Sequence, residues 1–212
     1  MNLETPWERE VKFWVRNLAR VRQRLEEKGA RVVQPRTHEY NLRFDTPDRA
    51  LGQGRRVLRL RRDRQATLTY KGPGVADADV AVREEIEVRV DDFAAARRLL
   101  ERLGYQVVLE YEKYRAVYAW NRARIMLDET PLGAFVEVEG PDAAVIRRVA
   151  EDLGLVWARR LTLSYAGLFA RVRARLHPPP EHLTFEALAP HQPLPDDWLP
   201  VMPADAARAS SE

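Results

Sequence analysis

Acidic and basic side chains occur in closely spaced groups along the chain, and their types suit the binding of metal ions and phosphates. Carboxylates supply the oxygen ligands that hard divalent cations such as Mg²⁺ or Mn²⁺ prefer. Lys and Arg donate hydrogen bonds to phosphate oxygens. The candidate acidic set is Glu8, Glu10, Glu85, Glu87, Asp128, Glu137 and Glu139. The candidate basic set is Lys12, Arg59, Arg61, Lys71, Arg83, Lys113 and Arg115.

Together, the two sets indicate a site for a polyphosphate with bound metal. The metal would cancel part of the phosphate charge, and the basic side chains would hold the rest. Transfer at phosphorus depends mainly on positioning and charge stabilisation, so it needs no Ser-His-Asp or Cys nucleophile. No such arrangement is apparent in the sequence, which has no cysteine.

The charged residues alternate with apolar ones, as they do in a β-strand whose successive side chains point to opposite faces. Glu8, Glu10 and Lys12 share one parity, for example, and Val11 and Phe13 share the other. The predicted strands cover residues 6–15, 37–45, 55–62, 65–71, 80–90, 106–120, 123–129 and 134–140. The predicted helices cover residues 18–28, 92–103, 142–153 and 162–175.

Two arrangements could explain these charged faces. Each could be the solvent-exposed side of an antiparallel sheet. Alternatively, helices could cover the apolar faces from outside, so that the charged faces look at one another across a closed interior. We favour the second, because eight strands repeat the same two-sign pattern. The fold class expected is therefore α+β, a closed or nearly closed antiparallel eight-stranded β-barrel tunnel with helices packed outside.

Composition narrows the class of protein further. The 212 residues carry 35 basic and 32 acidic side chains, a formal net charge of only +3, which argues against a general nucleic-acid coat. No apolar run is long enough for a membrane helix, and no signal peptide is apparent, so we expect a cytoplasmic protein without membrane contact. Residues 177–212 hold eight of the fourteen prolines. We expect a domain over 1–176 and a proline-rich, extended tail over 177–212, with a short packed stretch around Leu183–Leu188.

The charged groups also form an ordered series of short motifs. Glu8-x-Glu10-x-Lys12 comes first, and the remaining motifs occupy residues 39–47, 58–61, 69–73, 83–87, 112–115, 127–128, 132–139 and 164–165. This series resembles the CYTH family, the triphosphate tunnel metalloenzymes, which include class IV adenylate cyclases, thiamine triphosphatases and inorganic tripolyphosphatases. The resemblance spans about residues 5–175 and leaves the tail outside.

The resemblance implies a β-barrel tunnel that binds a triphosphate and one or two divalent metals, Mg²⁺ or Mn²⁺. It assigns the metal to Glu8, Glu10, Asp128, Glu137 and Glu139, with Glu85 and Glu87 close by. It assigns the phosphates to the basic set, and catalytic roles to the three family lysines Lys12, Lys71 and Lys113. One metal would orient the triphosphate and the other would activate water. Arg83 and Glu87 could equally be internal ion-pair partners.

Three functions remain open at this point. The first is a metal-dependent triphosphatase that releases orthophosphate from inorganic tripolyphosphate, thiamine triphosphate or a nucleoside triphosphate. The second is a class IV adenylate cyclase, which would use the same phosphate and metal residues to make cyclic AMP and pyrophosphate. We favour hydrolysis because no residue set specifies a purine. The third is a binding module, against which the full acidic set argues. The resemblance also allows a homodimer.

Overall fold

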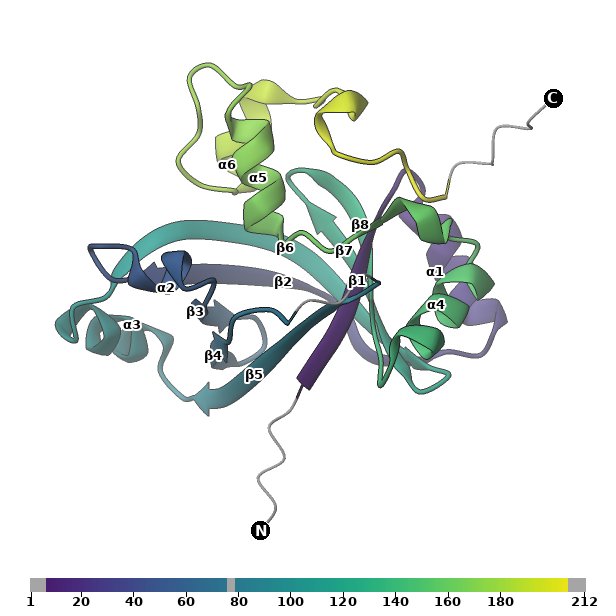
Figure 1. The fold of residues 1–212 in the computed structure, drawn as a ribbon, viewed down its shortest axis with the longest axis horizontal. Helices are drawn as coiled ribbons and strands as arrows, with labels where there is room; N and C mark the ends of the chain where they lie inside the picture. The colour runs from purple at the N-terminus through teal and green to yellow at the C-terminus, as the bar shows by residue number, and fades with distance from the viewer. Residues whose placement is uncertain (1–6, 76–78, 206–212) are drawn as a thin grey trace, which may run out of the picture.

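One antiparallel sheet, rolled into a ring, organises the computed structural model, which describes residues 7–75 and 79–205 (Figure 1). Its strands are β1 Trp7–Val15, β2 Arg31–Asp45, β3 Val57–Arg62, β4 Ala66–Lys71, β5 Ala81–Val90, β6 Gln106–Trp120, β7 Ala123–Thr130, β8 Gly133–Glu139 and β9 Arg160–Leu161. The strand order is β5-β4-β3-β2-β6-β7-β8-β1-β9, and an additional β5–β1 pairing closes the ring through eight strands. The expected α+β tunnel is confirmed.

The ring is tunnel-like but not strictly a barrel, because β1 divides one of its edges between two partners. Trp7–Glu10 of β1 pair with β5, whereas Lys12 and Phe13 pair with the two-residue strand β9 on that side. The opposite edge pairs with β8 from Glu10 to Val15. Closure between β1 and β5 therefore extends over four residue pairs, and β9 takes the place of β5 after them.

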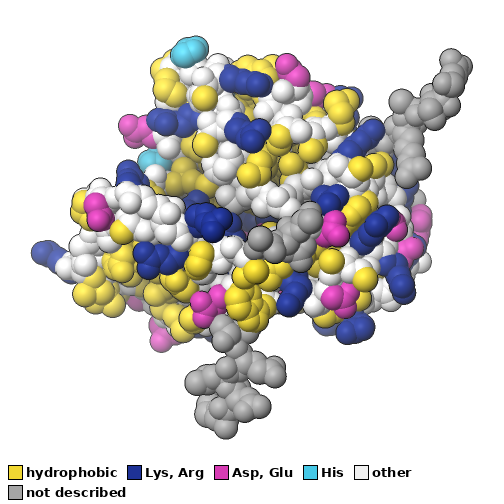
Figure 2. Space-filling view, in the orientation of Figure 1, with side chains coloured by type: hydrophobic (Ala, Val, Ile, Leu, Met, Phe, Trp, Pro, Cys, Tyr) yellow, Lys and Arg dark blue, Asp and Glu magenta, His cyan; other side chains and the backbone are white. Residues whose placement is uncertain are grey.

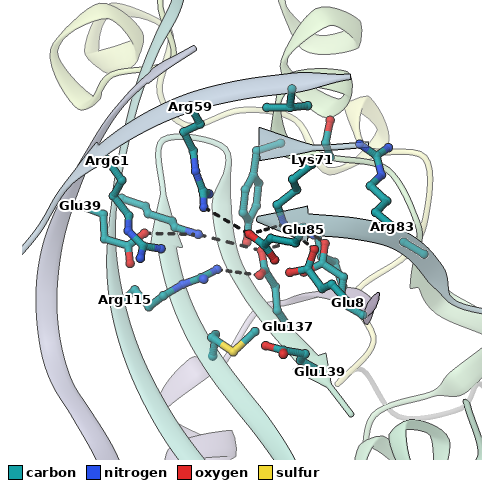
Figure 3. Close-up of a pocket in the computed structure, with 18 of the residues that line it drawn as sticks. Glu8, Glu39, Arg59, Arg61, Lys71, Arg83, Glu85, Arg115, Glu137 and Glu139 are labelled. Carbon is teal, nitrogen blue, oxygen red and sulfur yellow. Dashed lines mark hydrogen bonds and ion pairs between the residues drawn. The ribbon is translucent and has the colours of Figure 1, made fainter. Parts of the chain in front are cut away.

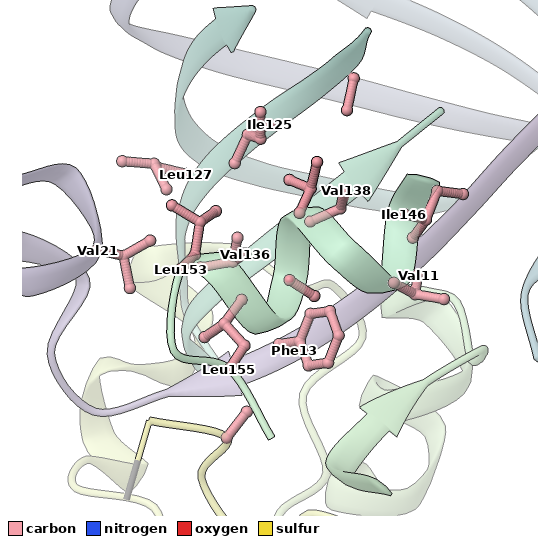
Figure 4. Packing of buried hydrophobic residues seen from close by; sticks show 14 of the residues in the cluster. Val11, Phe13, Val21, Ile125, Leu127, Val136, Val138, Ile146, Leu153 and Leu155 are labelled. Atoms are coloured by element: carbon pink, nitrogen blue, oxygen red, sulfur yellow. The ribbon is translucent and has the colours of Figure 1, made fainter. Parts of the chain in front are cut away.

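Three helices cover the apolar outer faces of the sheet. Helices α1 (Leu18–Glu27) and α4 (Ala143–Asp152) pack on β1, β7 and β8, where Phe13, Ile125 and Val136 are fully buried (Figure 4). Helix α3 (Phe93–Arg102) packs on the outer face of β2 and β3. Because these helices cover the face of the strands that carries the apolar side chains, the charged side chains that alternate with them face inward.

Helix α5 (Tyr165–Arg173) takes a different position, over one end of the ring. Its apolar side contacts Trp14, Phe135 and Leu109, which are buried. All three have the inward parity of their strands, so the inner face changes from charged to apolar where α5 covers it. Ser164 begins the helix by accepting a hydrogen bond from the Gly167 N–H.

The chain after α5 folds back over that helix and over the edge of the sheet. Leu183 N–H donates to Glu110 O of β6, and Leu183 O accepts from Glu112 N–H, so one residue of the segment joins the sheet edge. The short helix α6 (Phe185–Leu188) follows, and Leu183, Leu188 and Leu199 are buried with α5. The segment then reaches β1, where Ala204 N–H donates to Trp14 O at 2.7 Å.

Packing in this segment extends from Leu183 to Ala204, well beyond the short stretch around Leu183–Leu188 that the sequence suggested. The division into a domain over 1–176 and a tail over 177–212 stays a prediction. Among the elements that were not predicted are helix α2 (Ala50–Gln53) and strand β9. Strand β2 also begins at Arg31 instead of residue 37, because its first part follows β6 through two register shifts. Within the described ranges, none of the helices is long and apolar enough to cross a membrane.

Candidate active site

The ring encloses a cavity of about 530 Å³, which we call the tunnel cavity. Side chains from β1, β3, β4, β5, β6 and β8 converge on it (Figure 3), and α5 with the residues before it closes one end. Figure 2 shows Lys and Arg side chains around the recess beneath α5. Of the fourteen candidate site residues, thirteen line this cavity, and only Asp128 does not. Tertiary structure thus brings residues 8 to 139 to one space.

The first charged cluster lies deep in the cavity, near α5, around two buried carboxylates. Arg115 binds both oxygens of Asp128 at 2.6 Å and also Glu137 at 2.6 Å. Lys113 lies 2.9 Å from Asp128, and Tyr165 donates to the same carboxylate at 2.7 Å. Asp128, which is completely buried, therefore accepts four hydrogen bonds. This carboxylate holds the side chains of Lys113, Arg115 and Tyr165 in position.

Lys12 connects this cluster to the middle of the cavity. Its ammonium group lies 2.5 Å from Glu10 and 3.5 Å from Glu137. Burial by itself lowers the pKa of Lys12, but Glu10 and Glu137 more than offset it and raise the pKa above its ordinary value. Burial likewise opposes ionisation of Glu137, yet Arg115, Lys12 and Lys113 hold its pKa well below its usual range. Both groups are charged at neutral pH.

The second cluster lines the opposite wall, on β3, β4 and β5. Lys71 lies 2.5 Å from Glu8 and 3.4 Å from Glu85. Glu87 lies within ion-pair distance of Arg59 and Arg61, at 3.4 and 3.8 Å. For Glu87, the interpretation as an ion-pair partner therefore agrees with the geometry. Arg83 differs, since among the described residues its side chain has no ion-pair partner.

Several buried polar atoms of residues that line the cavity make no hydrogen bond. The Nε–H groups of Arg59 and Arg61 have no hydrogen-bond acceptor among the described residues, although Arg61 Nε lies 3.5 Å from Asp63. Oε2 of Glu39 accepts no hydrogen bond from them and lies 3.7 Å from Lys113. A buried donor without an acceptor costs on the order of 1–3 kcal/mol, so such groups mark places where a ligand atom belongs. Two guanidinium groups that line one cavity suit the oxygens of a phosphate.

Three carboxylates of the cavity lining, those of Glu8, Glu10 and Glu139, fit a divalent cation. Glu139 lies opposite Glu10 in the β1–β8 register and forms no ion pair with any described residue. Burial raises the pKa of Glu139, and the carboxylates of Glu8 and Glu10 raise it further, so that Arg124, its neighbour on β7, and Lys71 offset the rise only in part. A cation between these three carboxylates would remove that repulsion. Among the described residues, no three acidic or histidine side chains are already arranged as a metal cage.

The structure also brings in residues that the sequence analysis left out of the candidate set: Glu39, Arg43, Tyr111, Arg124 and Tyr165. Four of them share the inward parity of β2, β6 or β7, so alternation could have found them. Tyr165 belongs to a helix, and strand alternation carries no signal for it. Burial raises the pKa of Tyr165 well above its ordinary value, and Asp128 and Glu137 raise it further, so its hydroxyl remains a donor.

A comparison with protein families matches residues 7–153 to the CYTH domain. The chain belongs to the CYTH family. This CYTH domain is 30% identical over 132 residues to a Methanocaldococcus jannaschii protein whose name is "Putative adenylate cyclase"; the match covers 61% of this chain and 74% of that protein.

Solved structures share the fold. A Pyrococcus horikoshii protein matches with a TM-score of 0.67 and 27% identity, over 77% of this chain and 98% of that one. A Hippeastrum protein, described as a "putative adenylyl cyclase" with a dominant triphosphatase activity, matches with a TM-score of 0.54 and 18% identity, over 68% of this chain and 84% of that one. At that identity, the second match supports the fold alone. CYTH proteins act on triphosphates with divalent metals, and the chain shares their fold.

Proposed function

We propose that this CYTH protein is a metal-dependent triphosphatase, which cleaves the terminal phosphoanhydride bond of a triphosphate compound with water. The observation that carries the proposal is the pair of unmatched groups in one cavity. The Nε–H groups of Arg59 and Arg61 make no hydrogen bond with the described residues, and Glu139 presents a carboxylate that forms no ion pair with them. A metal-bound triphosphate supplies both missing partners, because its oxygens accept hydrogen bonds and its metal carries positive charge.

The basic side chains would bind and orient the phosphates. Arg59 and Arg61 would donate to non-bridging oxygens from one wall, and Lys113 and Arg115 would face them from the other. Burial lowers the pKa of both Lys12 and Lys71, but neighbouring carboxylates outweigh it, so both pKa values are raised. Glu10 and Glu137 act on Lys12, and Glu10 and Glu8 act on Lys71. They therefore act as fixed positive charges, not as proton acceptors. Positive charge around the bridging oxygen stabilises the negative charge that develops as the P–O bond breaks.

Glu8, Glu10 and Glu139 would hold the divalent cation, which supplies positive charge to the phosphate oxygens and acidifies bound water. Glu137 and Asp128 would act differently, because each of them pairs with two or more basic side chains among Arg115, Lys12 and Lys113, whereas Glu8 and Glu10 pair with one lysine each. Their contribution would be to hold those cations at the phosphates. In the overall reaction, a water oxygen bonds to the terminal phosphorus as the bond from that phosphorus to the bridging oxygen breaks. The bridging oxygen leaves with the diphosphate, orthophosphate is the other product, and the protons of the water are shared among the two products and the solvent.

Product analysis tests the proposal. Inorganic tripolyphosphate, thiamine triphosphate and ATP would each be incubated with the protein and Mg²⁺ or Mn²⁺. We expect orthophosphate together with the corresponding diphosphate. Stoichiometric cyclic AMP and pyrophosphate from ATP would instead establish the cyclase reaction, which the name of the M. jannaschii relative suggests. No turnover of any of the three would refute both.

A variant pair tests the metal carboxylates. Glu139→Gln keeps the size of the side chain and removes one negative charge from the proposed cation site. We expect the metal concentration for half-maximal activity to rise at least tenfold. Glu151→Gln is the matched control, since Glu151 is exposed on α4 and pairs only with Arg147 there. An unchanged metal requirement in Glu139→Gln would contradict the assignment.

A further inference from the structure

A second cavity of about 510 Å³ lies beside α5, between the first residues of β6 and the chain that follows the helix. We call it the side cavity. Leu109, Phe169, Leu176 and Pro179 give it apolar walls, and Arg173, His177 and Glu181 give it polar ones. Its volume lies within the range of small-molecule sites, about 300–1,000 Å³. The motifs shared with the CYTH family end before residue 176, so part of this wall belongs to this chain's own C-terminal segment.

The outer wall of the side cavity is held in place. Arg173 Nε donates to Pro180 O at 2.6 Å, which fixes the chain after α5 against that helix. Three residues later, Leu183 is anchored by its two backbone hydrogen bonds to β6 and by burial. A preformed cavity costs little conformational entropy when a ligand enters it.

Arg43 borders both the side cavity and the tunnel cavity, and it is the one described residue that lines both. It lies on β2 opposite Arg59 of β3 and Leu109 of β6. Among the described residues, none forms an ion pair or a hydrogen bond with its side chain. Burial lowers the pKa of Arg43, and the charges of Arg83 and Arg59 lower it further, with only partial compensation from Tyr111 and Asp45. A half-buried cation among other cations fits an anionic ligand.

The side chains that line the side cavity suit some of the ligands that could extend past Arg43 better than others. A longer polyphosphate chain would place further negative charges against the apolar side chains of Leu109 and Phe169, where burial opposes them; Glu181 would repel these charges and Arg173 would attract them. An uncharged or cationic ring system would instead bury apolar surface there and reach polar atoms at the rim. Apolar walls with a few polar groups are the usual lining of sites for organic ligands.

From this geometry we infer that the side cavity binds the organic group of an organic triphosphate, with Arg43 at the phosphate that bears this group. The inference rests on the proposed triphosphatase function and narrows its substrate class: an ester of triphosphate, such as a nucleoside or thiamine triphosphate, gains contacts that inorganic tripolyphosphate does not. Arg43 is a substrate-binding residue in this arrangement, and Phe169 offers its ring to the organic group.

The experiment fills the side cavity without touching the tunnel cavity. Ala170 is an exposed residue of α5 that lines the side cavity alone, so Ala170→Trp occupies the proposed space. The neighbouring Arg171 is exposed and lines neither cavity, so Arg171→Trp adds the same bulk elsewhere. We expect kcat/KM for ATP or thiamine triphosphate, divided by kcat/KM for tripolyphosphate, to fall at least tenfold in Ala170→Trp and to stay unchanged in Arg171→Trp.

Arg43→Gln gives a complementary result, since a phosphate lies at Arg43 with either substrate. We expect it to raise KM at least tenfold for tripolyphosphate and organic triphosphates alike. An unchanged substrate ratio in Ala170→Trp would overturn the inference. Tighter binding of a longer polyphosphate than of tripolyphosphate, lost in Ala170→Trp, would also overturn it and assign the side cavity to phosphate.

Binding measurements separate this inference from the proposed reaction. The dissociation constants of a non-hydrolysable ATP analogue and of tripolyphosphate are measured for the wild-type protein and for both tryptophan variants, with Ca²⁺ as the cation. Selective loss of the ATP analogue in Ala170→Trp supports the side cavity even if no substrate is turned over. Equal binding by all three proteins overturns it even if hydrolysis is established.

Discussion

The hydroxyl of Tyr165 donates a 2.7 Å hydrogen bond to Oδ2 of Asp128, and this bond joins the start of α5 to the inner face of β7. The ring of Tyr165 also lies 4.8 Å from the ammonium group of Lys113, within the range of a cation–π contact. One residue of a helix therefore holds both a buried carboxylate and one of its basic partners. The helix that closes the tunnel cavity is thus tied directly to its charged lining.

Replacing this tyrosine should separate its hydrogen bond from its packing. Tyr165→Phe keeps the ring and leaves Asp128 with three donors, so we expect the free energy of unfolding to fall by about 1.5–3 kcal/mol, the range for hydrogen bonds to charged groups. Urea unfolding measures it. Tyr118→Phe serves as the control, because Tyr118 is equally buried but its hydroxyl bonds to no described residue. Equal losses in both variants would mean that the bond to Asp128 adds no stability.

Removing the charge of Asp128 and removing that of Glu139 should change the free energy of unfolding in opposite directions. Asp128→Asn weakens the buried ion pairs with Lys113 and Arg115, and we expect a loss of about 3–5 kcal/mol in unfolding free energy. Glu139→Gln removes repulsion from Glu8 and Glu10, so metal-free protein should gain up to about 1 kcal/mol. Thermal or urea unfolding in the presence of a chelator measures both. Destabilisation by Glu139→Gln without metal would show that Glu139 has a cation partner in the protein.

The Asp45 carboxylate should make the free energy of unfolding depend on pH in the acidic range. Burial by itself raises its pKa, but the N–H groups of Leu51, Gly52 and Thr46, at 2.8–2.9 Å, more than offset this and lower it below the usual value of about 3.9. A lowered pKa contributes stability that is fully present above pH of about 4 and is lost as pH falls through the lower, folded-state pKa.

Urea unfolding from pH 2.5 to 6 tests this dependence. The difference in unfolding free energy between wild type and Asp45→Asn should be constant above pH of about 5 and shrink steadily below about 4. Asp48→Asn is the control, because the Asp48 carboxylate accepts no hydrogen bond from the described residues. A difference that does not vary with pH would refute the role of these three N–H groups.

Leu183 should show that the C-terminal segment belongs to the folded unit. Its side chain is 1% exposed and packs with α5, so Leu183→Ala should cost about 2–5 kcal/mol of unfolding free energy. Leu103→Ala, at a position 66% exposed, should change it by less than about 0.5 kcal/mol. Denaturant unfolding followed by tryptophan fluorescence compares them. A near-zero effect at Leu183 would mean that the segment detaches in solution.

Alternation in the sequence determined most of the tunnel lining. A strand has a side-chain period of two, so once helices take the apolar parity, the charged parity must face the interior. That reasoning selected Glu8, Lys71 and Glu137 from distant parts of the chain, and all three line one cavity. It depends only on local backbone geometry, which explains why it succeeds without tertiary information.

The alternation of side chains along a strand does not show where along the tunnel axis a residue lies or which other elements cover it. Asp128 has the inward parity, yet α5 and the basic side chains around it separate it from the cavity. Arg43 has the same parity as Glu39, and its role appeared only when β6 and the C-terminal segment placed a second cavity beside it. These distinctions depend on strand register, and register is a property of pairs of strands.

The sequence by itself determined the sheet, its inward charges and the family motifs, because each follows from the period of a strand or the spacing within one segment. Only the tertiary structure decided that α5 closes one end of the ring and that Leu183 joins β6 some 70 residues earlier in the chain. Their contacts are made between surfaces that become adjacent after the ring has closed, and no local pattern of residues encodes that adjacency.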